Sequence, residues 1–118
     1  MAGKVTHFEV IGKDAKKLQD FYSQLFGWTV DANNEMNYGM VDGAQSGIGG
    51  GIAPSMDGGA GHVTFYVEVD DLAAALAKAE SMGGKTAMPP MAVPGGPEIA
   101  QFTDPEGHLV GLVKTGSM

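Results

Sequence analysis

The chain has 118 residues, a formal net charge of −7 and no cysteine, and its seven basic residues are all lysine. This length predicts one domain over residues 1–118, and the composition excludes disulfides, cysteine-ligated metals and arginine forks for phosphate. An acidic chain is a poor partner for nucleic acid or an anionic membrane, since both bind basic surfaces. No apolar run reaches membrane-spanning or signal-peptide length, so we expect a cytoplasmic protein that binds a small-molecule ligand.

The first half of the chain predicts a strand, a helix and three shorter strands. Residues 5–10 alternate in polarity with a period of two. Asp14 is placed to cap a helix whose apolar side chains recur at helical spacing, and Gly27 is placed to end it. We expect the shorter strands at residues 28–31, 37–42 and 46–52.

The second half predicts the same order. A strand at residues 62–69 precedes a helix that Asp70 or Asp71 caps and that ends at Gly83-Gly84. Three strands follow at residues 85–88, 99–103 and 108–113. The turn between the last two is Asp104-Pro105-Glu106-Gly107, which carries the residues that a type I turn favours.

Strand 62–69 separates into two faces. Val63, Phe65, Val67 and Val69 form an apolar face, which we expect the following helix to cover. The opposite face carries the polar side chains of this strand, and we expect it to meet the ligand: His62, Thr64, Tyr66 and Glu68.

The two halves are similar to each other. A histidine lies on the first strand of each half, at His7 and His62, and each first strand is followed by a capped helix with a leading leucine, Leu18 or Leu72. We therefore predict an α+β fold of two βαβββ modules, about residues 1–56 and 57–118.

This pattern resembles the vicinal oxygen chelate superfamily, which includes glyoxalase I, bleomycin- and fosfomycin-resistance proteins and extradiol dioxygenases. Within this superfamily, the chain resembles short bacterial proteins related to lactoylglutathione lyase. The resemblance covers nearly the whole chain. It is carried by His7-Phe8-Glu9-Val10, by Phe21-Tyr22-x-x-Leu25-Phe26-Gly27-Trp28, by Gly47-Ile48-Gly49-Gly50-Gly51-Ile52 and by Asp104-Pro105-Glu106-Gly107-His108-Leu109-Val110-Gly111-Leu112.

The resemblance implies two half-barrels that form a cleft, in which some members hold a divalent metal. Carried over to this chain, the metal ligands would include His7 and His62. The two expected carboxylate positions fall on Gly111 and in the Gly49–Gly51 run, and glycine has no side chain to coordinate with. Glu9 is a candidate third ligand from outside the family pattern, with Glu68 a more remote one, whereas the alternative is two pocket histidines with no ion.

The remaining candidate site residues would line the pocket. Tyr38, Tyr66 and Phe102 are candidate aromatic walls, and ordinary core packing is their alternative. Gly50 and Gly111 would let a ligand approach the backbone closely.

Two functions fit these residues. The first is a glyoxalase-like lyase or isomerase acting on a small oxygenated substrate, with Glu9 or Glu68 as the base. The absence of arginine and the acidic charge argue against the two carboxylates of glutathione, and so against lactoylglutathione lyase activity itself. The alternative is a metal-independent, bleomycin-resistance-like protein that sequesters a drug or metabolite. An interaction subunit is a third reading, and in each case the resemblance implies a homodimer.

Overall fold

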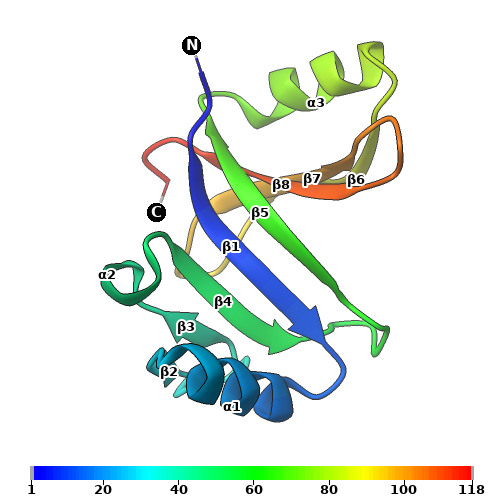
Figure 1. The fold of residues 1–118 in the computed structure, drawn as a ribbon. Coiled ribbons are helices and arrows are strands. Elements are labelled where there is room, and N and C mark those ends of the chain that lie inside the picture. Colours follow the sequence, from blue (N-terminus) through cyan, green and yellow to red (C-terminus); the bar gives the residue numbers. More distant parts are fainter. Residues whose placement is uncertain (1, 118) are drawn as a thin grey trace. The chain divides into compact units, whose positions relative to one another are not determined.

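A computed structural model describes residues 2–117 of the chain, which form a mixed α+β fold with the expected repeated order (Figure 1). The first module contains β1 (Val5–Gly12), α1 (Ala15–Phe26), β2 (Val30–Asp31), β3 (Gly39–Val41), a short α2 (Gly43–Ser46) and β4 (Gly49–Pro54). The second contains β5 (His62–Val69), α3 (Leu72–Ser81), β6 (Lys85–Ala92), β7 (Glu98–Thr103) and β8 (Leu109–Lys114). The prediction of two βαβββ modules is confirmed.

The described residues divide into two compact units, which we call the first unit (His7–Thr64) and the second unit (residues 2–6 and 65–117). The boundary therefore falls inside β1 and β5. In the first unit the strand order is β2-β3-β4-β1, and β4 runs parallel to β1 with Gly51 opposite Glu9. The buried core of this unit is Val10, Val41 and Ile52, and Leu18 and Tyr22 of α1 pack against it.

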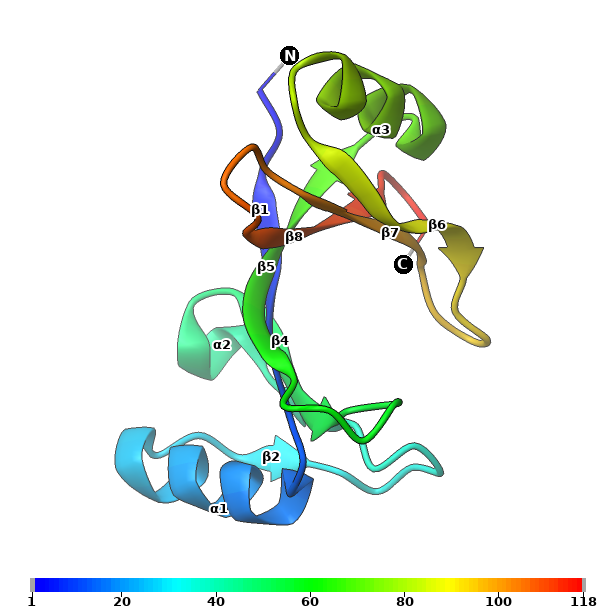
Figure 2. The same cartoon turned by 90° about the vertical axis from the view of Figure 1, so that its right-hand side faces the viewer.

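The second unit repeats this architecture. Its strand order is β5-β8-β7-β6, and β8 runs parallel to β5 with Gly111 opposite Tyr66. Helix α3 covers one face of these strands, as Figure 2 shows for β6 and β7. The buried core is Leu72, Leu76, Ala100 and Leu112.

The helix boundaries follow from capping. The Asp14 carboxylate accepts a hydrogen bond of 3.1 Å from the backbone N–H of Lys17, and Gly27 ends α1 with a left-handed φ of 74°. Of the two candidate caps in the second module, Asp71 is the one used, since its side chain accepts 3.0 Å from the N–H of Ala74.

Two of the shorter strands differ from the expectation. The strand expected at residues 46–52 begins only at Gly49, because the Asp42 side chain accepts a hydrogen bond from the N–H of Ala44 and starts the helical turn α2. The strand expected at residues 85–88 continues to Ala92, and irregular register after Thr86 accommodates its prolines.

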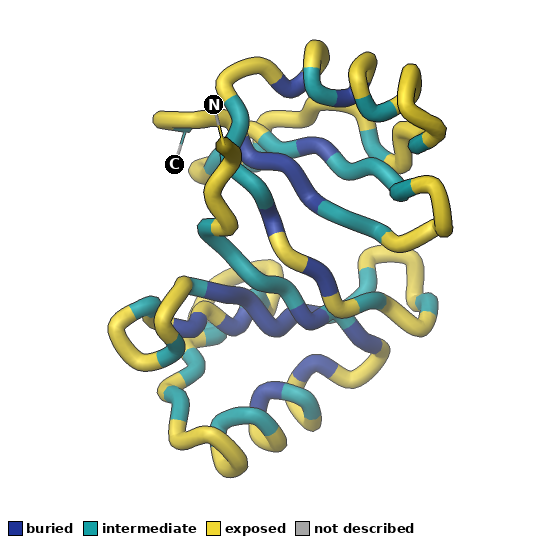
Figure 3. The backbone as a smooth tube through the Cα atoms, turned by 45° about the horizontal axis from the view of Figure 1, so that its top comes forward, coloured by how far each residue is buried: buried dark blue, intermediate teal, exposed yellow. Residues whose placement is uncertain are grey.

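The two faces of β5 are not covered as expected. Val63 and Phe65 are 73% and 43% exposed, whereas Thr64 and Tyr66 are 5% and 4% exposed. Only Val67 and Val69 pack against the core under α3. Figure 3 shows the same change of burial along the strand. Tyr66 is buried because the glycine opposite it, Gly111, leaves room for its ring.

The structure also changes which residues correspond between the modules. The caps Asp14 and Asp71 and the strand ends Gly12 and Val69 align the repeats. This alignment places Glu9 and Tyr66 at equivalent positions, each opposite a glycine of the parallel last strand. His7 then corresponds to Thr64 and not to His62, so the sequence comparison of the two histidines was out of register.

Candidate functional site

Four polar side chains of the first unit form a connected group, which we call the Glu9 cluster: His7, Glu9, Tyr38 and His62. The Tyr38 hydroxyl lies 2.8 Å from His7 Nε2 and donates to Glu9 Oε2 at 3.2 Å. The other carboxylate oxygen, Glu9 Oε1, lies 3.3 Å from His62 Nε2. The cluster therefore joins three segments of the chain, and the Glu9 carboxylate is at its centre.

The hydrogen bonds of the cluster have a defined direction. Because the single hydroxyl proton of Tyr38 goes to Glu9, the Tyr38 oxygen accepts from His7, which assigns the His7 proton to Nε2. Burial lowers the pKa of His7 below its ordinary value of 6.5, and the Glu9 carboxylate offsets part of this effect. His7 is thus a neutral donor at neutral pH, and the Glu9 carboxylate, only 13% exposed, accepts from both sides.

Tyr38 is held in place by its own loop. The Asn34 side chain donates to the Tyr38 carbonyl at 2.8 Å and accepts from the Tyr38 N–H at 2.9 Å. Asn37 adopts a left-handed φ of 52°, a conformation that asparagine tolerates better than most residues. Buried Gln19 of α1 donates to the carbonyls of Asn37 and Ile52, which ties this loop to β4.

The Tyr38 ring occupies the space above Gly51. A Cβ placed on Gly51 would overlap the ring and hydroxyl of Tyr38. Gly51 is the residue of β4 opposite Glu9, inside the run where the resemblance led us to expect a carboxylate ligand. A tyrosine from another segment thus fills the space that a side chain at this position would take.

The second unit contains an equivalent pair. A Cβ on Gly111 would overlap the ring of Tyr66, whose hydroxyl accepts 3.0 Å from Gln101 Nε2. Phe102 packs against the core of Leu72, Leu76, Ala100 and Leu112. Glu68 lies on β5 in this unit, and its backbone N–H donates to the Lys4 carbonyl. The structure therefore groups Glu9 with the histidines of the first unit, whereas Glu68 belongs to the second unit.

The other predicted pocket residues are placed as follows. Thr64 is buried at the end of the first unit. Gly50 lies against the ring of Phe8, its partner on β1, so the phenyl ring takes up the close approach that we had expected a ligand to make.

The cluster does not fit a bound divalent metal of the family type. The Nε2 atoms of His7 and His62 are each engaged, with Tyr38 and with Glu9. Of the glycines at which carboxylate ligands were expected, Gly111 and Gly51 are covered by tyrosine rings and Gly50 by the ring of Phe8. Among residues 2–117, no group of three or more His, Asp or Glu side chains is arranged to hold a metal ion. A catalytic metal ordinarily needs three protein ligands, so we derive no chemical step from one.

Comparison with known proteins agrees with the fold. The model of the Glyoxalase/Bleomycin resistance protein/Dioxygenase superfamily matches residues 4–112. The chain belongs to this superfamily. In addition, no helix within residues 2–117 is long and apolar enough to cross a membrane.

Individual members of the superfamily are similar over most of the chain. The protein named Putative glyoxylase CFP32, from Mycobacterium bovis and Mycobacterium tuberculosis, is 30% identical over 97 residues. The match covers 80% of this chain but 37% of the relative, so the chain spans well under half of that protein's length. A superfamily member from Vibrio splendidus has a TM-score of 0.63 at 16% identity and covers 96% of this chain and 99% of its own. Methylmalonyl-CoA epimerase from Mycobacterium tuberculosis has a TM-score of 0.62 at 15% identity, over 93% and 86% of the two chains.

Sequence reasoning missed the residues that position the Glu9 cluster, Asn34 and Gln19, whose side chains bond to the loop of Tyr38. It also missed Gln101, which bonds to the Tyr66 hydroxyl in the second unit. Gln19 carried the one usable signal, since it is a polar residue at a helical position that faces the sheet and must therefore be hydrogen-bonded there.

Proposed function

We propose that this glyoxalase-superfamily chain binds a small oxygenated molecule at the Glu9 cluster and uses the Glu9 carboxylate to move a proton. The observation that carries the proposal is the double anchoring of Glu9 by Tyr38 at 3.2 Å and by His62 at 3.3 Å. A general base must be held in a fixed orientation to act on a bound substrate, and two donors on opposite oxygens provide this.

The proposed step is a proton transfer at carbon. Glu9 removes the proton from a carbon next to a carbonyl group, so that the C–H bond breaks and an O–H bond forms on the carboxylate. The electron pair of the C–H bond passes to the carbonyl oxygen, which becomes an enolate oxygen. Return of the proton to the same carbon gives exchange or epimerisation. Where the reacting carbon carries a hydroxyl group, return of the proton to the former carbonyl carbon, with transfer of the hydroxyl proton to the other oxygen, gives the isomer. No oxidant or co-reactant is consumed in any of these outcomes.

Solvent exchange tests this proposal. The full chain is incubated in D2O with hydroxyacetone, lactaldehyde and the adduct of methylglyoxal with glutathione, and deuterium incorporation is followed by proton NMR. We expect exchange into at least one compound and a loss of about 10²-fold or more in Glu9→Gln. Glu68→Gln is the matched control and should keep the wild-type rate. Equal rates in wild type and Glu9→Gln would refute the role of Glu9.

A second candidate function is supported by the aromatic rings. In the first unit the partly buried ring of Tyr38 lies over Gly51, which supplies flat aromatic surface beside polar groups. Together with the net charge of −7, this suits a cationic aromatic ligand that is held without reaction. Thermal stabilisation by bleomycin-type glycopeptides, in a protein that exchanges no deuterium into the carbonyl panel, would favour sequestration over catalysis.

We also propose that the chain forms a homodimer, as the resemblance implies. Large apolar side chains remain exposed on the described chain, among them Leu25, Phe65 and Met82. Exposed apolar surface of this kind is typical of association sites. Sedimentation velocity at two protein concentrations would distinguish a dimer from a monomer.

A further inference from the structure

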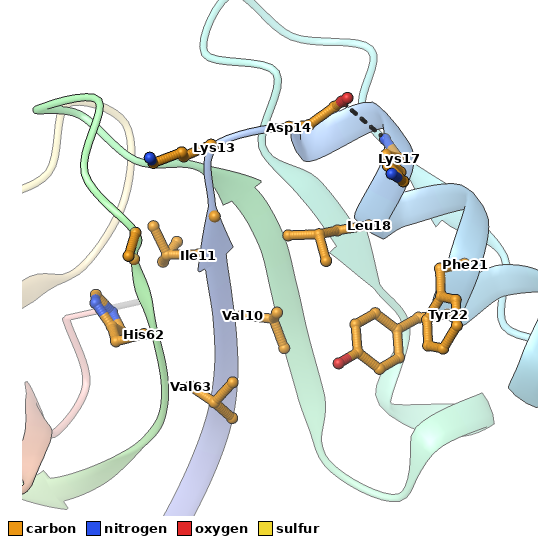
Figure 4. Close-up of a pocket in the computed structure, with 13 residues that line it drawn as sticks. Val10, Ile11, Lys13, Asp14, Lys17, Leu18, Phe21, Tyr22, His62 and Val63 are labelled. Carbon is orange, nitrogen blue, oxygen red and sulfur yellow. Dashed lines mark hydrogen bonds between the residues drawn. The ribbon is translucent and has the colours of Figure 1, made fainter.

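A pocket lies on the helix side of the first unit, and His62 is the one residue that it shares with the Glu9 cluster. It has a volume of about 630 Å³ and lies between α1 and the strands β1 and β5. Figure 4 shows Val10, Leu18 and Tyr22 pointing toward one another across it. This volume is within the range of about 300–1,000 Å³ that is typical of small-molecule sites.

One part of the pocket is apolar and open to solvent. Val63 and Phe21 line it and are 73% and 56% exposed. Val10 and Leu18 form the floor, where the helix meets the core of the unit. Burial of these surfaces against a hydrocarbon would be favourable, since apolar area leaves water.

The other part of the pocket is positively charged. Lys13 and Lys17 lie at the start of α1 and line the pocket together with one carboxylate, that of Asp14. Asp14 is occupied in capping the helix, through the bond of 3.1 Å from the Lys17 N–H. Within residues 2–117, neither lysine ammonium makes an ion pair, in contrast to Lys16, which pairs with Asp20 at 3.1 Å. Two lysines against one acid thus give a local positive charge on a chain of net charge −7.

We infer that this pocket binds a carboxylic acid with an extended apolar body. The carboxylate would lie near the start of α1, where Lys13 and Lys17 line the pocket, and the hydrocarbon would cover Val63 and Phe21. Charge complementarity selects this occupant, because a neutral or cationic amphiphile would leave both ammonium groups without a counter-ion. The inference does not depend on the proposed chemistry at Glu9.

Calorimetric titration of the full chain with decanoate tests the inference. We expect saturable binding of one decanoate per chain, weaker binding of decanol, and no binding of decyltrimethylammonium. Affinity should rise from hexanoate to decanoate by up to about threefold per methylene. Lys13→Gln and Lys17→Gln should each weaken decanoate about twofold to fivefold, since each removes one partly exposed charge contact.

Lys16→Gln is the matched control, because it removes an equal charge from the same helix outside the pocket and should leave the affinity unchanged. Val63→Asp alters an exposed side chain, so the variant should fold and should lose decanoate binding. Three results would overturn the inference: no saturation, equal affinity for decanoate and decanol, or equal losses in the Lys13, Lys17 and Lys16 variants. A different result is a dimer that the Val63→Asp substitution dissociates and that decanoate does not dissociate. That result would show that the pocket is occupied by a second copy of the chain.

Discussion

Tyr38 lies over Gly51, and its hydroxyl joins His7 to Glu9 in a continuous chain of hydrogen bonds. Because Gly51 has no side chain, the ring of Tyr38 can enter the space beside the polar residues of β1. The relationship explains how histidines that resemble metal ligands can be satisfied without an ion, since the Nε2 atom of each already has a hydrogen-bond partner.

The Tyr38–Gly51 packing predicts that a methyl group at position 51 is costly. Gly51→Ala should destabilise the fold by about 1–3 kcal/mol, because the new Cβ would force the Tyr38 ring to move. Urea unfolding measures the loss. Gly49→Ala in the same strand is the control, since its Cβ would meet only backbone atoms at 3.7 Å and 4.0 Å, which is an ordinary contact. If both variants lose the same stability, the ring does not rest on Gly51 as described.

The Tyr38 hydroxyl predicts a second loss of stability. Tyr38→Phe keeps the ring but leaves His7 and Glu9 each without one hydrogen bond, so the free energy of unfolding should fall by about 1–3 kcal/mol. Tyr22→Phe is the control, because no hydrogen bond of the Tyr22 hydroxyl is found within residues 2–117, and it should change stability by less than about 0.5 kcal/mol. A Tyr38→Phe protein as stable as the Tyr22→Phe protein would contradict the network.

The lowered pKa of His7 predicts how stability changes with pH. Because burial holds the folded-state pKa below 6.5, the unfolded chain binds a proton at this residue more readily than the folded chain does. The contribution of His7 is therefore present above pH 6.5 and is lost as the pH falls through the folded-state pKa. His7→Gln should reduce the loss of stability between pH 7.5 and pH 5.5, as measured by urea unfolding.

The control for this pH effect is His108→Gln, which alters an exposed histidine that pairs with Asp104 in a turn. That variant should still lose stability on acidification as the wild type does. If His7→Gln keeps the full pH dependence, His7 is not the partly buried, neutral imidazole inferred from its lowered pKa.

Because Asp71 and not Asp70 caps α3, the two aspartates should contribute differently to stability. Asp71→Ala should cost about 1 kcal/mol, because it removes the acceptor for the Ala74 N–H. Asp70→Ala should cost much less, since Asp71 alone caps the helix. Thermal unfolding of the two variants compares them directly, and equal effects would show that the cap is not confined to Asp71.

The local features of the fold were predictable from the sequence. The caps at Asp14 and Asp71, the stop at Gly27 and the limits of β5 all follow from short-range chemistry, namely side-chain acceptors, glycine freedom and period-two alternation. The sequence did not predict the α2 turn (Gly43–Ser46). The Asp42 side chain caps this turn and so prevents the extended backbone that the sequence pattern predicts there.

The candidate site was only partly predictable. The sequence placed His7 and Glu9 on one face of a strand, but it left both Glu9 and Glu68 as candidates for the acidic residue. It could not show that Tyr38 bonds to His7 and Glu9, because that contact depends on the course of a loop fixed by Asn34. Alternation along β5 likewise could not tell which face is covered, since the burial of Tyr66 depends on Gly111 in a distant strand.

The most direct measurement is the rate of solvent deuterium incorporation in protein treated with a strong chelator, with and without added nickel, zinc or manganese, for wild type, Tyr38→Phe and Glu9→Gln. If the tyrosine-anchored carboxylate moves the proton by itself, the chelated wild type keeps its full rate, added metal changes nothing, Tyr38→Phe is slower and Glu9→Gln is inactive. Exchange that disappears on chelation and returns with a divalent ion would show that the histidines bind a metal after all, and that Tyr38 gives way to it.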